Sequence, residues 1–138
     1  MSEHILESNG FCLRLVLNVF ESDIEYPINT NMTVSVKNNE FSAKTDMDID
    51  IKAFADFTDQ LKKVYDTLSG EAMIKEPYGY QRYISFQADK TGHVIVKGYI
   101  CDDMKNNVLC FENSFDQTFL KSFSNELCSM YLKYKQEK

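Results

Sequence analysis

Aspartates recur at every second position in the stretch "TDMDID", residues 45–50. Carboxylates this close together could bind a divalent cation or take part in acid–base catalysis. The same alternation is also typical of the solvent-facing side of a β-strand, where successive side chains point to opposite faces. The residues concerned are Asp46, Asp48 and Asp50, and the choice between these interpretations separates an enzyme from a binding protein.

The neighbours of the three aspartates argue against metal and phosphate chemistry. A calcium loop in this register requires glycine at position 51 and a bidentate glutamate at position 57, but the chain has Ile51 and Phe57. A phosphate-accepting aspartate would follow a buried parallel strand, whereas "FSAKT" alternates. We therefore expect Asp46 on the outer face of a strand, and Asp48 or Asp50 as the N-cap of a helix that follows it.

Two histidines and four cysteines are the other candidates for catalysis or metal binding. His4 lies in an N-terminus that we expect to be frayed, and His93 follows a turn glycine, where we expect a hydrogen bond to backbone. The cysteines show no CxxC pair and no zinc-finger spacing, so we expect buried, reduced thiols and no metal or cofactor. The sequence does not exclude a catalytic Cys–His pair whose two residues are distant in the chain but adjacent in the folded protein. The cysteines are Cys12, Cys101, Cys110 and Cys128.

Composition predicts one ordinary globular domain over residues 1–138, with 43% hydrophobic and 26% charged residues. The N-terminal segment "MSEHILESNG" has neither the basic nor the apolar part of a signal peptide, and no apolar run reaches the roughly 20 residues of a membrane-spanning helix. We therefore expect a cytoplasmic protein. No GxSxG, HExxH, P-loop or GxGxxG motif occurs, so nothing specific predicts an enzyme.

Charge is distributed unevenly along the chain, whose net charge is −6. Residues 1–60 hold eleven acids and four bases, whereas residues 61–138 hold ten acids and eleven bases. Nucleic-acid binding requires a basic surface, which this chain lacks. An acidic half predicts instead either a basic protein partner or a surface that serves solubility.

Hydrophobic periodicity predicts seven strands and two helices. Alternation indicates strands over residues 11–20, 32–39 and 41–47, with Phe41, Ala43, Thr45 and Met47 facing inward. A period of three to four residues then predicts a helix from Ile51 to Leu68, stopped by Gly70. The remaining strand candidates are residues 71–76, 83–88, 93–100 and 107–112.

The segment after residue 112 predicts the second helix. Ser114 and Gln117 fit a capping box, with Ser114 as N-cap. The apolar stripe consists of Leu120, Phe123, Leu127, Met130 and Tyr134. Short turns between strands favour an antiparallel sheet. The predicted fold class is therefore α+β: one antiparallel sheet of about seven strands, in the order three strands, helix, four strands, helix, with both helices packed on one face.

Two loops carry residue types that dominate protein interfaces. The segment "EPYGYQRY" places Tyr78, Tyr80 and Arg82 in a turn between strands, and tyrosine and arginine are enriched among interface hot spots. Tyr83 is either part of this surface or partly buried in its strand. The segment "ESDIEY" adds Glu21, Asp23 and Glu25 on a second loop. Together with Asp46, these residues predict a surface that binds a basic protein.

Several segments, taken in order over residues 9–134, resemble the WapI-like immunity proteins that bacteria encode beside polymorphic toxins. They include "FADFTDQLKKVYDTLSGEA", "GHVIVKGYI", "LCFENSFDQTFL" and "FSNELCSMY". The matching positions are Phe11, Leu13, Phe54, Phe57, Leu61, Gly92, His93, Val96, Asp116, Gln117, Thr118 and Leu120. The resemblance implies a cytoplasmic protein that neutralises a cognate toxin, often a nuclease, by binding and without catalysis.

Two other functions stay open at the level of the sequence. One is a small cytosolic enzyme or ligand-binding domain with a pocket between helices and sheet, and the other is a protein-interaction module with no toxin partner. We predict a non-catalytic immunity protein whose basic partner contacts Glu21, Asp23, Glu25, Asp46, Tyr78, Tyr80 and Arg82.

Overall fold

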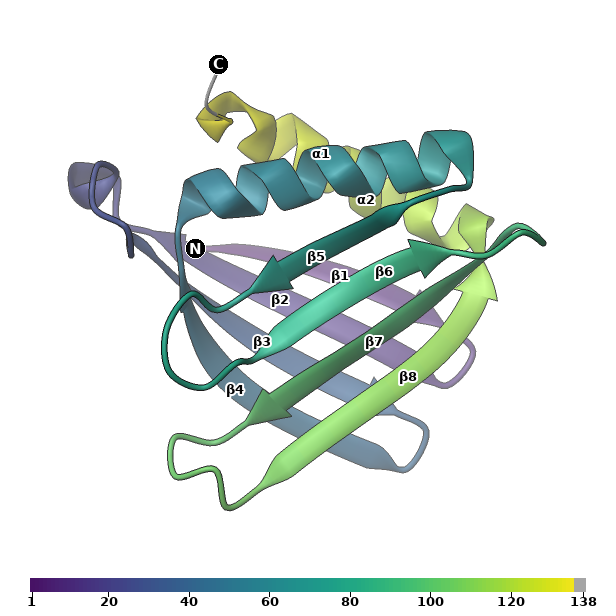
Figure 1. The fold of residues 1–138 in the computed structure, drawn as a ribbon, viewed down its shortest axis with the longest axis horizontal. Helices are drawn as coiled ribbons and strands as arrows, with labels where there is room; N and C mark the ends of the chain where they lie inside the picture. The colour runs from purple at the N-terminus through teal and green to yellow at the C-terminus, as the bar shows by residue number, and fades with distance from the viewer. Residues whose placement is uncertain (136–138) are drawn as a thin grey trace.

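Eight strands form two four-stranded antiparallel sheets in the computed structural model, which describes residues 1–135 (Figure 1). The N-terminal sheet has the strand order β1-β2-β3-β4 and the C-terminal sheet the order β5-β6-β7-β8. The elements are β1 (Ser2–Ser8), β2 (Phe11–Val19), the 3₁₀ turn η1 (Glu21–Asp23), β3 (Thr30–Asn38), β4 (Phe41–Ile49), α1 (Ile51–Thr67), β5 (Glu71–Lys75), β6 (Tyr83–Ala88), β7 (His93–Cys101), β8 (Val108–Asp116), η2 (Gln117–Leu120), α2 (Lys121–Tyr131) and η3 (Leu132–Tyr134).

The predicted α+β class is confirmed, but the single seven-stranded sheet is wrong. β4 and β5 do not pair, because α1 carries the chain from the edge of the N-terminal sheet to the C-terminal sheet. The sheets meet face to face where β4 contacts β7 and β8. Periodicity along the chain describes each strand separately, so it could not decide whether the strands on either side of α1 share a sheet.

The eighth strand is β1, in the segment expected to be frayed. It pairs with β2 along its whole length, for example Leu6 with Leu13. His4 and Leu6 face the core and are only 1% exposed, whereas Ile5 between them is 45% exposed. A histidine at one inward position and an isoleucine at an outward one obscured the alternation that would have predicted this strand.

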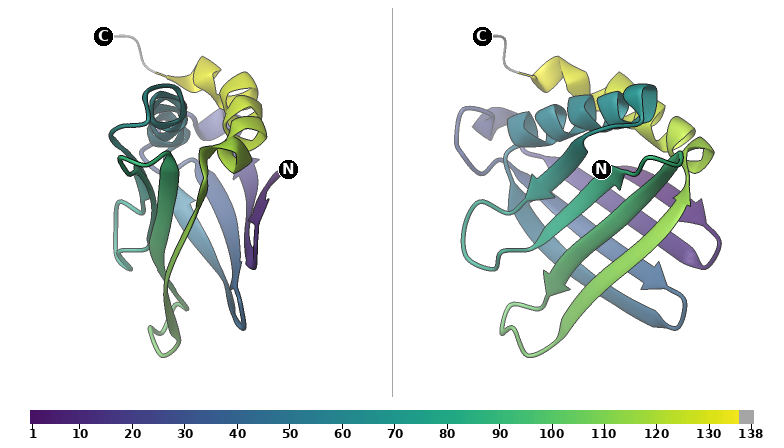
Figure 2. Two further views of the ribbon diagram at one scale, coloured as in Figure 1. Left: turned by 90° about the vertical axis from the view of Figure 1, so that its right-hand side faces the viewer. Right: turned by 45° about the vertical axis from the view of Figure 1, so that its right-hand side comes forward.

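The two helices lie side by side along one side of the molecule, across the opening between the sheets (Figure 2). α1 packs against β5 and β6 of the C-terminal sheet, and α2 packs against α1 and against β1 of the N-terminal sheet. The helices therefore bridge the two sheets instead of covering one face of a single sheet. In α2 the predicted stripe is wrong at Met130, which is 37% exposed, while Tyr131 is buried.

The start of α1 confirms the predicted cap at one of the two candidate aspartates. The Asp50 carboxylate accepts a hydrogen bond from the backbone N–H of Lys52 at 2.9 Å. The helix ends at Thr67, and Leu68 adopts the left-handed conformation with φ 54°, so the stop comes before Gly70.

The predicted cap at Ser114 is wrong. Pairing of β8 with β7 continues to Asp116, so Ser114 is an exposed strand residue opposite Ile95. Asp116 instead accepts the backbone N–H of Thr118 at 2.9 Å at the start of η2. Both residue types are good N-caps, and only the length of the β7–β8 pairing decides between them.

Replacing Asp50 with alanine should lower the free energy of unfolding by about 1 kcal/mol, the usual effect of losing an N-cap. The matched control is Ser114→Ala, which should stay within about 0.5 kcal/mol because it changes an exposed strand residue. Urea unfolding of both variants gives the two values. Equal losses would show that the Asp50 carboxylate contributes no more to stability than an exposed serine.

Candidate partner-binding surface

Three loops lie at the same end of the molecule, on the left in Figure 1. They are loop 20–29 between β2 and β3, loop 76–82 between β5 and β6, and loop 102–107 between β7 and β8. Loops held by a rigid β framework commonly carry binding residues. Six of the seven predicted partner-binding residues lie on the first two of these loops, and Asp46 lies on β4.

The aspartates of "TDMDID" contribute acidic groups to the outer face of the N-terminal sheet. Asp46 is exposed and accepts the Thr33 hydroxyl at 2.6 Å, and Asp48 accepts the side-chain N–H of Asn31 at 3.3 Å. Both bonds join β4 to β3. The predicted outer position of Asp46 is confirmed, and within residues 1–135 no three His, Cys, Asp or Glu side chains are arranged to hold a metal ion.

Loop 20–29 exposes the predicted acidic residues Glu21, Asp23 and Glu25. Glu21 also accepts a hydrogen bond from the phenol of Tyr134 in η3. Burial, together with this bond to a carboxylate, raises the pKa of Tyr134 to about 12. The phenol is therefore protonated at neutral pH and remains a hydrogen-bond donor to Glu21.

Loop 76–82 exposes Tyr78 but not Arg82. Tyr78 is 62% exposed, whereas Arg82 is 2% exposed, so the expectation that Arg82 lies on the exposed surface of this loop is wrong. Its guanidinium makes two hydrogen bonds to the Glu76 carboxylate, Nε–Oε1 at 2.9 Å and Nη2–Oε2 at 3.0 Å. Burial lowers the pKa of Arg82, but the bonds to Glu76 outweigh this effect and the net shift is upward. Arginine suits this position because its planar fork matches a carboxylate.

The Arg82–Glu76 pair fastens the loop to both sheets. Arg82 Nη1 also donates to the Thr45 hydroxyl at 2.6 Å and to the Cys101 carbonyl at 3.1 Å, and Thr45 donates to the same carbonyl at 2.6 Å. The Tyr80 ring lies over the guanidinium, 4.3 Å from its central carbon. Arg82 is therefore a residue that positions Tyr80.

The C-terminal end of β4 holds both the acidic loop 20–29 and the tyrosine-bearing loop 76–82. The backbone N–H of Asp48 donates to Glu76 at 2.9 Å, which fixes loop 76–82 beside β4. The Asp50 carboxylate accepts the Asn29 side-chain N–H at 3.0 Å, which fixes the end of loop 20–29 next to the same strand end. The structure thus places the predicted loops around one strand end, with Asp46 and Asp48 on its outer face. Sequence reasoning missed Asp48 as a surface group.

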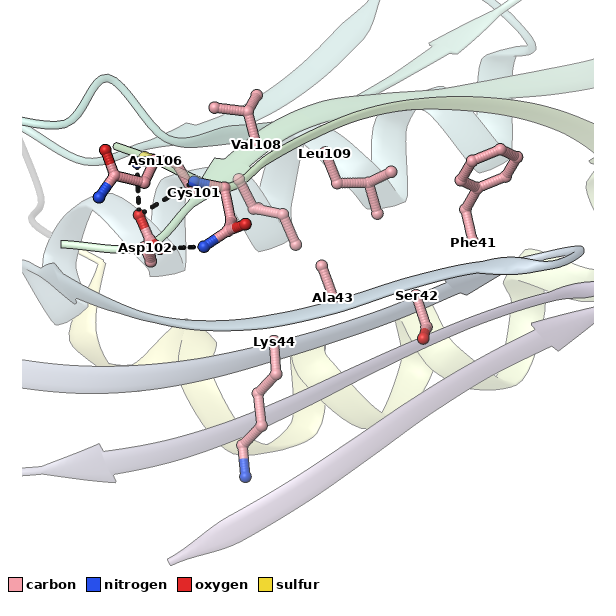
Figure 3. Close-up of a pocket in the computed structure, with 11 residues that line it drawn as sticks. Phe41, Ser42, Ala43, Lys44, Cys101, Asp102, Asn106, Val108 and Leu109 are labelled. Atoms are coloured by element: carbon pink, nitrogen blue, oxygen red, sulfur yellow. Dashed lines mark hydrogen bonds between the residues drawn. The ribbon is translucent and has the colours of Figure 1, made fainter. Parts of the chain in front are cut away.

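A separate groove of about 450 Å³ lies between the start of β4 and the β7–β8 hairpin (Figure 3). Ala43, Ile100 and Leu109 are among its lining residues. The Asp102 side chain at its rim is bonded to the backbone N–H of Asn106 at 2.9 Å and to the side chain of Asn107 at 2.7 Å. These bonds stabilise the turn and leave fewer acceptor sites for a ligand. Strands border this groove, whereas the ligand-binding hypothesis placed its pocket between helices and sheet.

Neither histidine lies on loops 20–29, 76–82 or 102–107. His4 is buried, with Nδ1 2.6 Å from Glu126 Oε1 and Nε2 2.6 Å from the Tyr131 phenol oxygen, so it links β1 to α2. His93 is exposed and its ring bonds the Thr91 hydroxyl at 2.8 Å, so the predicted bond from its ring to backbone is wrong. The contacts of both histidines lie within the fold: those of His4 join distant segments, and that of His93 stays within one turn.

The four cysteines differ in exposure. Cys101 is buried as expected, but Cys110 is exposed on β8, and Cys12 and Cys128 are partly buried. Cys110 faces outward because its neighbour Phe111 occupies the inward position of that strand. Burial raises the pKa of the Cys12 and Cys128 thiols. A raised pKa lowers the fraction of the reactive thiolate at neutral pH.

These differences predict the order of thiol reaction with Ellman's reagent at pH 7.5. Cys110 should react first, Cys12 and Cys128 more slowly, and Cys101 only after unfolding, because burial limits the access of the reagent. The raised pKa of Cys12 and Cys128 slows these two thiols further. Unfolded protein trapped by alkylation should give four thiols. A count of two or fewer would contradict the expectation that all four are reduced.

A rigid β framework that displays acidic and aromatic side chains on neighbouring loops is typical of protein-binding domains. The chain belongs to the WapI-like immunity protein family, whose model matches residues 4–135. Immunity proteins in general have a toxin as partner and are generally not enzymes. No match was found among curated proteins or among solved structures. No helix within residues 1–135 is long and apolar enough to cross a membrane.

Proposed function

We propose that this chain is a cytoplasmic immunity protein that binds and neutralises a cognate toxin without catalysis. The binding surface is the end of the molecule that carries the acidic loop 20–29 and the tyrosine-bearing loop 76–82. Family membership supports the immunity role. The observation that carries the choice of surface is the attachment of both loops to one end of β4, through Asp48 to Glu76 and through Asp50 to Asn29. The proposal is supported by the position of the loops that carry Glu21, Asp23, Glu25, Tyr78 and Tyr80 at one end of the molecule, while Asp46 lies on β4, the strand that joins these loops.

The acidic and the aromatic side chains have different roles in this proposal. Exposed acidic groups attract a basic toxin domain over a distance and increase the association rate, while salt screens them beyond about 8 Å at physiological ionic strength. Tyr78 and Tyr80 act at short range, where buried aromatic contacts slow dissociation. A nuclease toxin, which must bind nucleic acid, would present the basic surface that this mechanism requires.

The test of the function is co-expression with the toxin domain encoded beside this chain. Cells should survive, and the purified pair should bind at low salt. If cells are not protected, or no complex forms, the immunity function is wrong and the groove beside β4 becomes the better candidate site.

Reversing Asp23 and Glu25 to lysine should slow association with that toxin domain at low salt and have less effect at high salt. The control is the double reversal Glu40→Lys with Glu71→Lys, which changes net charge by the same amount at exposed positions away from the three loops. Stopped-flow association rates distinguish the two. Equal slowing in both variants would mean that net charge, and not this surface, guides the encounter.

A further inference from the structure

Loop 20–29 exposes three large apolar side chains beside its acids. Phe20 is 44% exposed, Tyr26 is 63% exposed and Ile28 is 40% exposed. Exposed apolar residues occur singly on most surfaces, but three within nine residues of one short connection are a concentrated group. In Figure 1 this loop projects beyond the strands of the N-terminal sheet, so a partner could reach it.

The Asn29 side chain, which is fully buried, holds this loop in place. Its side-chain N–H groups donate to the carbonyl of Ile24 at 3.0 Å, to the carbonyl of Tyr26 at 3.1 Å and to Asp50 at 3.0 Å. Its side-chain oxygen accepts the backbone N–H of Ile51 at 2.8 Å. One amide therefore joins the middle of the loop to the first residues of α1.

Backbone bonds within the loop add to this anchoring. The N–H of Phe20 donates to the Asn29 carbonyl at 2.8 Å and closes the loop, and the N–H of Tyr26 donates to the Asp23 carbonyl at 2.9 Å. Lys52 of α1 donates to the Ile24 carbonyl at 3.0 Å. Because these bonds already order the loop, binding to it loses little conformational entropy, which favours affinity.

The charge of the loop indicates what kind of partner it fits. Residues 20–29 contain three acids and no base, and the ammonium of nearby Lys52 is bonded to a backbone carbonyl. A matching surface would surround an apolar pocket with lysine or arginine side chains. Charge complementarity therefore selects a basic protein surface as the occupant.

We infer that loop 20–29 is the main docking element, with Tyr26 as its central anchor and Phe20 and Ile28 beside it, for a basic surface of the toxin that contains an apolar pocket. The inference rests on the proposed function. It adds apolar anchors that hold the complex together after the acidic groups have guided the encounter. Asn29 positions these anchors and does not itself contact the toxin, because it is buried.

The experiment measures dissociation of the purified complex with the toxin domain encoded beside this chain. Tyr26→Ala should increase the dissociation rate about tenfold or more, as expected for an aromatic hot spot. It should leave the unfolding midpoint unchanged, because Tyr26 contributes to the loop bonds through its backbone. The control is Phe41→Ala at the opposite end of β4. Phe41 is 69% exposed, so its predicted inward position is wrong and its ring is available as an exposed control.

The outcomes separate this inference from the function on which it rests. In one outcome, the wild-type chain binds the toxin domain while the Tyr26→Ala complex dissociates no faster than the Phe41→Ala complex. In that case loop 20–29 is not the docking element, although the immunity function stands. If the wild-type chain does not bind the toxin domain or does not protect cells, both proposals fail. A tenfold faster dissociation of Tyr26→Ala alone supports the inference.

Discussion

Replacing Arg82 with methionine is expected to lower the free energy of unfolding by about 3–5 kcal/mol, the usual effect of removing one partner of a buried ion pair. The loss is large because Glu76, only 5% exposed, would keep its charge without a cationic partner. Thr45 would also lose the donor that now lies 2.6 Å from its hydroxyl. Urea unfolding monitored by circular dichroism measures the difference.

An exposed ion pair provides the matched control. Arg14 pairs with Glu3 on the surface of the N-terminal sheet, and both side chains are about half exposed. Exposed pairs contribute about 0–1 kcal/mol, so Arg14→Met should have a small effect. Similar losses in the two variants would contradict the importance of burial at Arg82.

A double variant separates the ion pair from packing. Combining Arg82→Met with Glu76→Leu removes both charges, and buried pairs replaced by apolar residues are often no less stable. The double variant should therefore recover part of the stability lost in Arg82→Met. Full recovery is not expected, because the N–H of Asp48 loses its acceptor at Glu76. No recovery would mean that Arg82 stabilises the fold through its other contacts, among them Thr45 and Cys101, and not through the pair with Glu76.

Arg82 also illustrates what the sequence could not predict. An arginine between tyrosines suggests an exposed interface, since arginine is almost never fully buried without a partner. Its partner Glu76 lies only six positions earlier, but the bonds to Thr45 and Cys101 join segments far apart in the chain. Burial of Arg82 follows from the packing of the two sheets, and periodicity along the chain carries no information about that packing.

Loop 20–29 shows the opposite situation, because its sequence does carry a signal for exposed apolar residues. The segment "ESDIEY" predicts its acidic residues, whereas Phe20 falls at the end of the strand predicted over residues 11–20, and neither Tyr26 nor Ile28 is among the predicted binding residues. Large apolar residues inside a turn-rich segment are such a signal, because a loop that only connects two strands has no need of them. Only the structure assigns the role of Asn29, since its bonds reach α1.

The strands from β2 onward and the helix α1 were predictable because their apolar spacing is regular over many residues. The 3.6-residue period of α1 places Ile51, Phe54, Phe57, Leu61 and Val64 on one face, and all five are buried. This face touches β5 and β6 as well as α2, so it is continuous with the core of the domain. Residues on this face should therefore be among the most sensitive to truncation.

Replacing Phe54 with alanine is accordingly expected to lower the free energy of unfolding by about 3–5 kcal/mol, from lost burial and the cavity left behind. Phe54 is fully buried, and its ring centroid lies 5.4 Å from that of Phe57 and 5.2 Å from that of Tyr131. Tyr131 in turn bonds His4 of β1, so Phe54 lies where both helices meet the N-terminal sheet.

The control is again Phe41→Ala, which removes the same ring from an exposed position and should change stability by no more than about 0.5 kcal/mol. Because α1 begins where Asp50 and Ile51 hold Asn29, loosening the helix should also loosen loop 20–29. Hydrogen exchange at the Tyr26 amide should therefore accelerate in Phe54→Ala and not in Phe41→Ala. If Phe54→Ala loses stability without faster exchange at Tyr26, the anchoring of the loop does not depend on the packing of α1.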